Sequence, residues 1–337
     1  MLLAGIVSEK ERDIEQKAKR LVVHIGMPKT GTSALRHLLA DNADYLASHD
    51  ILVPMPMADK KAWHRRFARE LAGRSEEGSA TGYCERMSHA IGGSGATTAI
   101  LSAETFSTLG PSSDVANRLA DFAQSIGRRV TIIIFLRRQQ DYAESLYVQR
   151  VKTGYLNSDF ETFVEENLGK PVFDYTKLLA PWETAFDDIV VRKFVPENIA
   201  TDFFDATGLH VSPEQLPAPI GRYNLRMTAR TVEQLRFCTS LLEKEGVGRF
   251  ERGKLLARVM EVLPDSHGPA FHALTPQLSE RIRRTCDDTN DEIARRYFDS
   301  PPLFPDTGPL PEPTVVRIDD PQEQARLTDL VARLHGP

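Results

Sequence analysis

LVVHIGMPKTGTSALR, residues 21–36, is the stretch that decides the expected fold. It begins with a run of apolar or β-branched residues that only His24 interrupts, a pattern typical of a short buried strand. The segment 26–31 should end that strand, because Gly and Pro interrupt regular structure. A helix is expected after it, with Thr32 or Ser33 as its N-cap.

A strand, a glycine-containing loop with a lysine, hydroxyl residues and a helix form, in this order, the layout of a phosphate-binding loop. Backbone N–H groups at the helix start point at an anion, the helix dipole favours it, and Lys29 adds a full charge. In nucleoside-triphosphate loops the lysine directly follows the second glycine. Here Lys29 precedes Gly31 by two residues and Thr32 follows Gly31, so the order differs. The alternative is a strand-to-helix turn with an incidental lysine.

A second expected strand, TTAILSA at 97–103, ends in Glu104. The carboxyl ends of strands in an α/β sheet are where ligands bind, so this carboxylate is a candidate functional group. The alternative is that Glu104 only caps the next segment.

Two arginines stand where a third strand, 130–136, meets the next helix. Cations at a helix N-terminus oppose the helix dipole, and a bound anion would reverse that penalty. Arg137, Asp141 and Ser145 follow one another at intervals of four residues. Arg offers forked donors to a phosphate and Ser adds a hydroxyl donor. The alternative is two surface arginines, with Arg138 the rival of Arg137, and an ordinary helix serine.

The PKTGTS segment, residues 28–33, resembles the 5′-phosphosulfate loop of sulfotransferases that use 3′-phosphoadenosine 5′-phosphosulfate (PAPS), roughly PK[ST]G[ST][ST]. The Arg137 and Ser145 pair resembles the motif with which that family holds the 3′-phosphate. The resemblance implies a P-loop-like three-layer α/β fold, with a central parallel sheet and helices on both faces. It implies these cofactor-binding residues: Lys29, Thr30, Gly31, Thr32, Ser33, Arg137 and Ser145.

The resemblance also implies a reaction, the transfer of a sulfuryl group from PAPS to a hydroxyl, less readily an amine, of an acceptor. Lys29 would neutralise the leaving oxygen and Glu104 would act as the base. His24 and His267 are the next candidates for the base. The scheme requires no metal. Alternatives from other classes are a P-loop nucleotide kinase or NTPase, and a non-catalytic nucleotide- or glycan-binding homologue.

The sequence departs from cytosolic members of the family in two places. Ala34 stands where they carry a Trp that stacks on adenine, and the region near 267–269 lacks their late Arg and Lys. These departures favour the bacterial or carbohydrate-type branch, and hence a carbohydrate or glycoconjugate acceptor.

Composition excludes several other classes. The chain has 337 residues, 41% of them hydrophobic, and a net charge of −5, which provides no overall field for nucleic acid. Its three cysteines are odd in number and widely spaced, which favours a reducing, cytoplasmic compartment and no metal site. The apolar start is too short for a signal peptide, and no stretch is long enough to span a membrane.

The expected organisation is an N-terminal lead-in at 1–20, one sulfotransferase-like α/β domain at 21–300 whose last part is mainly helical, and a Pro-rich segment with a final helix at 301–337. Parallel strands are expected near 21–26, 98–103, 130–136 and 189–195, with a short one at 51–53. Helices are expected at 34–40, 58–72, 83–91, 112–126, 140–152, 159–168, 175–186, 199–207, 228–244, 252–262, 277–298 and 321–334.

Overall fold

Parallel strands form the centre of the first of two units in the computed structural model. The model describes residues 19–55, 63–74, 82–112, 114–221, 227–263, 268–299, 301–306, 308–314 and 316–335. The first unit comprises residues 1–137 and 175–223, and the second comprises 138–174 and 224–337. The predicted domain boundaries stay a prediction.

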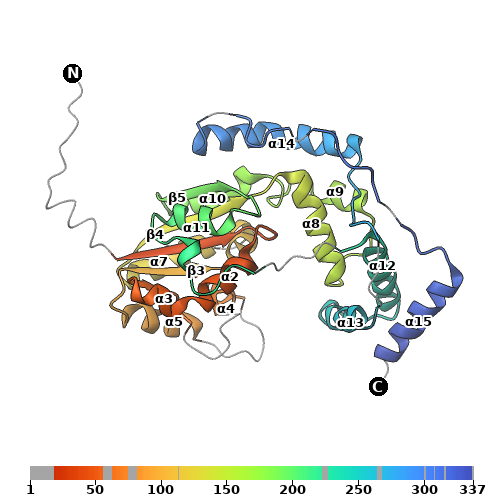
Figure 1. Ribbon diagram of the computed structural model, residues 1–337, viewed down its shortest axis with the longest axis horizontal. Helices are drawn as coiled ribbons and strands as arrows, with labels where there is room; N and C mark the ends of the chain where they lie inside the picture. Colours follow the sequence, from red (N-terminus) through yellow and green to blue (C-terminus); the bar gives the residue numbers. More distant parts are fainter. Residues whose placement is uncertain are drawn as a thin grey trace. The chain divides into compact units, whose positions relative to one another are not determined.

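The sheet of the first unit has five strands in the order β2-β3-β1-β4-β5, and every pair is parallel (Figure 1). The strands are β1 Arg20–Gly26, β2 Ile51–Leu52, β3 Thr98–Ser102, β4 Arg129–Leu136 and β5 Ile189–Lys193. Strands buried on both faces of a parallel sheet need continuous apolar runs, which is why these segments were recognisable. β1 is the central strand, with β3 on one side and β4 on the other. The loop after β1 therefore leaves the sheet at the point where the strand order changes direction.

Helices cover both faces of this sheet, as predicted. On one face α2 Thr32–Asp41, α3 Ala43–Ser48 and α11 Ile199–Thr207 pack in one apolar core with Val22 and Phe135. The connections from β2 to β3, from β3 to β4 and from β4 to β5 cross the sheet in the direction opposite to the connection from β1 to β2. Because such crossovers are right-handed, their helices lie on the opposite face of the sheet. These are α4 Trp63–Leu71, α5 Tyr83–Gly92, α7 Val115–Ser125 and α10 Tyr175–Ala185, with the short α6 Thr105–Leu109 at the end of β3.

The second unit is built from helices over its described residues, apart from an isolated bridge between Thr228 and Ala270. Tyr147 stacks on Phe271 at 5.3 Å in its interior. The helices are α8 Gln139–Lys152, α9 Phe160–Asn167, α12 Ala229–Lys244, α13 Arg249–Val262, α14 Pro276–Tyr297 and α15 Pro321–His335. The predicted helical C-terminal region is therefore confirmed.

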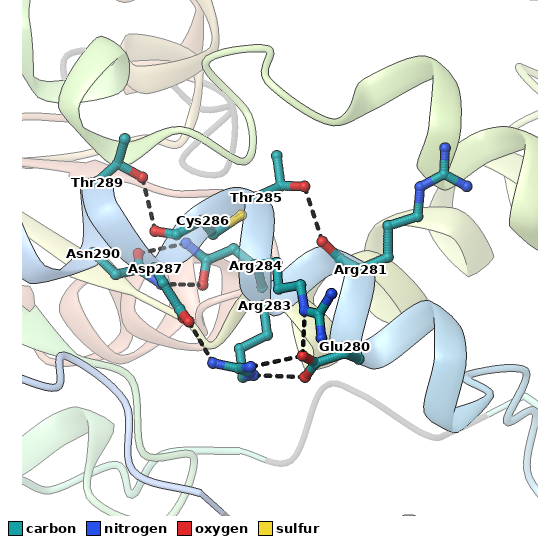
Figure 2. Close-up of polar contacts among 10 residues, drawn as sticks. Glu280, Arg281, Arg283, Arg284, Thr285, Cys286, Asp287, Thr289 and Asn290 are labelled. Carbon is teal, nitrogen blue, oxygen red and sulfur yellow. Dashed lines mark hydrogen bonds and ion pairs between the residues drawn. The ribbon is translucent and has the colours of Figure 1, made fainter.

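Charged side chains on one side of α14 form ion pairs with one another within the helix. Figure 2 shows Glu280 accepting hydrogen bonds from both Arg283 and Arg284, while Arg283 also contacts Asp287. Such pairs at i,i+3 and i,i+4 stabilise a helix by about 0.2–0.5 kcal/mol each. These arginines are thus occupied by carboxylates of their own helix, which makes them poor candidates for an anion site.

The predicted starts of two helices were wrong, and part of a third predicted helix lies outside the described residues. Gly31, with φ 79°, is the N-cap of α2 in place of Thr32 or Ser33. The helix expected from 112 begins at Val115 with Asp114 before it, because a 3-10 turn occupies Gly110–Ser112. The first part of the helix expected at 58–72 lies outside the described residues.

Two histidines are buried around Ser102 at the carboxyl end of β3. The Nδ1 of His24 lies 2.8 Å from the Ser102 hydroxyl, and the Ser102 N–H donates to Nδ1 of His64 at 3.1 Å. His64 also contacts the carbonyl of Pro54 at 3.0 Å through Nε2. Burial lowers the pKa of His24 to about 3 and that of His64 to about 4, so folding keeps both rings neutral.

The first unit should therefore lose stability in mild acid. Below pH 6.5 the unfolded chain binds protons at His24 and His64 that the folded chain does not. Each histidine should lower the free energy of unfolding by up to about 1.4 kcal/mol per pH unit. We expect His64→Gln, which keeps one acceptor and one donor, to remove about half of this slope between pH 6.5 and 5. Urea unfolding followed by tryptophan fluorescence measures it, and equal slopes in both proteins would contradict the assignment.

Candidate functional site

The loop after β1 is shaped by left-handed backbone and by its own hydroxyl groups. Lys29 has φ 64° and Gly31 has φ 79°. Thr30 and Thr32 both donate to the carbonyl of Met27, at 2.6 and 3.3 Å. Their hydroxyl protons thus hold the turn together, which leaves their backbone N–H groups for the predicted binding of an anion.

The start of α2 offers the donors that an anion requires. The first hydrogen bond of the helix runs from the Leu35 N–H to the Gly31 carbonyl at 3.0 Å. The N–H groups before Leu35 therefore have no acceptor within the helix. The first turn contains no acidic residue that could neutralise them, and the side chain of Ser33 is exposed. This end of α2 is suited to a phosphate or sulfate.

Glu104 lies against the end of β1 because residue 26 is a glycine. A Cβ atom on Gly26, which has φ 108°, would lie 2.9 Å from Cα of Glu104 and 3.0 Å from Oγ of Ser107. The close approach brings the β3 turn to the loop that carries Lys29. The Oε2 atom of Glu104 is buried and has no hydrogen-bond partner among the described residues. A buried carboxylate oxygen without a partner costs free energy, which calls for a functional explanation.

Arg137 contacts the same loop from the end of β4. Its Nη1 donates to the carbonyl of Lys29 at 3.0 Å, and its guanidinium lies 5.6 Å from the ring centre of Phe194. The hydroxyl of Tyr175 donates to the Arg137 carbonyl. The structure therefore brings Lys29, Arg137 and the loop to one edge of the sheet, as expected from the two motifs.

The neighbouring arginine is engaged elsewhere. Arg138 holds the carboxylate of Asp141 with two hydrogen bonds of 3.0 Å each, from Nε and Nη2. Asp141 thus serves Arg138, although the motif spacing groups it with Arg137. Ser145 is half-buried on α8 in the second unit, and its sharing of a phosphate with Arg137 stays a prediction.

Of the two histidines named as alternative bases, the structure describes only His24. His24 is fully buried and kept neutral by burial, which makes it part of the core beneath the loop. His267 lies outside the described residues.

Sequence reasoning did not identify three residues that support the site. Gly26 carried a local signal, since a glycine at the end of a buried strand permits a close approach. Tyr175 and Phe194 carried none, because their contacts with Arg137 exist only once distant segments are folded together.

Neither membrane spans nor metal clusters occur in the part of the chain that the structure describes. No described helix has the length and apolar character needed to cross a membrane. No three His, Cys, Asp or Glu side chains in the described ranges are grouped to hold a metal, and a metal-free reaction stays a prediction.

Comparison with known proteins adds one relative. No family model matches the chain, and no solved structure matches it. It is 28% identical over 209 residues to a protein of Archaeoglobus fulgidus named "Uncharacterized protein". The alignment covers 59% of this chain and 53% of that relative, so the chain spans about half the length of the curated relative it matches.

Replacing Gly26 should disturb the site through its contact with Glu104. Gly26→Ala adds a methyl group 2.9 Å from backbone, whereas Gly127→Ala, at φ 64°, adds one in open space. Gly127→Ala therefore measures the cost of a positive φ where the added methyl group makes no contact, although φ at Gly26 is larger. We expect Gly26→Ala to cost about 1–3 kcal/mol more in unfolding free energy, the usual cost of overpacking. Urea unfolding of both variants checks this, and equal losses would show that the close approach is unimportant.

Proposed function

We propose that this protein is a PAPS-dependent sulfotransferase that modifies a hydroxyl of a carbohydrate or glycoconjugate. The observation that carries the proposal is Glu104, whose Oε2 atom is buried without a hydrogen-bond partner and whose backbone lies against the end of β1, next to the loop that we propose binds an anion. A carboxylate repels a bound anion, so its position there is unfavourable for a site that only binds phosphate. It suits a site in which a second, uncharged substrate must lose a proton next to the anion.

Each group of the loop has a role in this proposal. The N–H groups at the start of α2, with the exposed hydroxyl of Ser33, hold the 5′-phosphosulfate. Lys29 stabilises the negative charge that grows on the bridging oxygen. PAPS, when bound, supplies the sulfuryl group, and Glu104 takes the proton of the acceptor hydroxyl. Arg137 and Ser145 remain the residues proposed for the 3′-phosphate.

Nucleotide binding separates this proposal from a nucleotide kinase or NTPase. A triphosphate loop needs Lys directly after Gly and a hydroxyl free for magnesium. Here Thr32 stands after Gly31 at the position of that lysine, and only the hydroxyl position after it, Ser33, agrees with a triphosphate loop. We expect calorimetry to show binding of adenosine 3′,5′-bisphosphate that exceeds binding of ATP with Mg²⁺. The opposite order would contradict the proposal.

The role of Glu104 separates an enzyme from a non-catalytic homologue. Glu104→Gln keeps the size of the side chain and removes the base, so turnover should fall by about 10²–10⁴-fold. Affinity for adenosine 3′,5′-bisphosphate should be retained. Sulfuryl transfer from PAPS to a panel of neutral glycans measures turnover, with Glu85→Gln, an exposed glutamate on α5, as the matched control. Turnover near wild type in Glu104→Gln would exclude Glu104 as the base.

A further inference from the structure

Arg137 supports the loop at a carbonyl that unusual backbone geometry turns toward it. Lys29 is a non-glycine residue with φ 64°, a left-handed conformation that side chains disfavour. Its carbonyl accepts the Nη1 hydrogen bond of Arg137 at 3.0 Å. A charged donor on this carbonyl stabilises the strained conformation, so the shape of the loop depends on Arg137.

The guanidinium is itself held by a fixed support. The Phe194 N–H donates to the Leu136 carbonyl at 2.7 Å, which continues the sheet pairing, and the ring of Phe194 lies under the guanidinium. The same ring would lie 3.3 Å from a Cβ atom on Gly31. One aromatic side chain therefore contacts both Arg137 and the end of the turn. Tyr175 fixes the backbone of Arg137 through its carbonyl.

We infer that Arg137 is a positioning residue that fixes Lys29 and the N–H groups of the loop for a 5′-phosphate or phosphosulfate. This inference rests on the proposed function and deepens it. If Arg137 positions the loop, its loss should weaken the binding of every ligand that uses the loop. If Arg137 only binds the 3′-phosphate, its loss should weaken the binding only of ligands that carry a 3′-phosphate. The two roles therefore predict different ligand dependence.

A pair of ligands separates the roles. Adenosine 3′,5′-bisphosphate and adenosine 5′-monophosphate differ only in the 3′-phosphate, and calorimetry gives the affinity of each. We expect Arg137→Ala to weaken binding of the monophosphate by about tenfold or more, as for the loss of one charge-assisted hydrogen bond. A further loss confined to the bisphosphate would add a direct contact to the positioning role. Unchanged monophosphate affinity with weakened bisphosphate binding would overturn the inference.

Arg138→Ala is the matched control, because Arg138 is the adjacent arginine and its guanidinium binds Asp141. It should leave monophosphate affinity unchanged. Arg137→Lys keeps a charge but loses the planar stacking group, and we expect it to recover only part of the affinity. A monophosphate affinity that falls equally in Arg138→Ala would also overturn the inference.

Hydrogen exchange of the ligand-free protein tests the loop without any nucleotide. Arg137→Ala should speed exchange of the Met27 and Leu35 amides, which donate to Phe135 and Gly31 at the two ends of the loop. Exchange within β3 should stay unchanged, which shows that the variant is folded. If wild type binds neither nucleotide, the proposed function fails while this result still decides the role of Arg137. Unchanged exchange in the loop would contradict that role.

Discussion

The close approach of the β1 end to the backbone of Glu104 is the constraint on which the site depends. A side chain at position 26 would have to share space with Cα of Glu104, 2.9 Å away. With glycine there, the turn after β3 and the loop after β1 can touch. The turn that carries Glu104 thus lies against the end of the strand that leads into Lys29.

Burial keeps charge off the two histidines below this contact. The hydroxyl of Ser102 lies 2.8 Å from His24, and its N–H donates to His64 at 3.1 Å. Burial holds both histidines neutral at physiological pH, so these two rings add no positive charge beneath the loop. Lys29, Arg137 and the start of α2 contribute positive charge or partial positive charge at the loop.

The sequence predicted what short-range physics controls. The strands of the sheet are apolar runs, and α11 ends at Thr207 as expected because Gly208 takes φ 66°. The hydrogen bond from Arg137 to Lys29 spans 108 residues, and no local pattern could indicate it. The hydroxyl bonds of Thr30 and Thr32 to Met27 are short-range, but a threonine at either position could equally bind a ligand, cap the helix or bond within the loop, so the sequence alone does not decide between these roles.

Two adjacent arginines show how position, more than residue type, sets the role of a side chain. Arg137 is the last residue of the first unit before the chain enters the second, and its guanidinium lies on the loop and on Phe194. Arg138 is the N-cap of α8, where Asp141 in the first turn compensates its charge against the helix dipole. Because Lys29, Glu104 and Arg137 all belong to the first unit, the parts proposed to hold and activate the 5′ end of a nucleotide come from one unit.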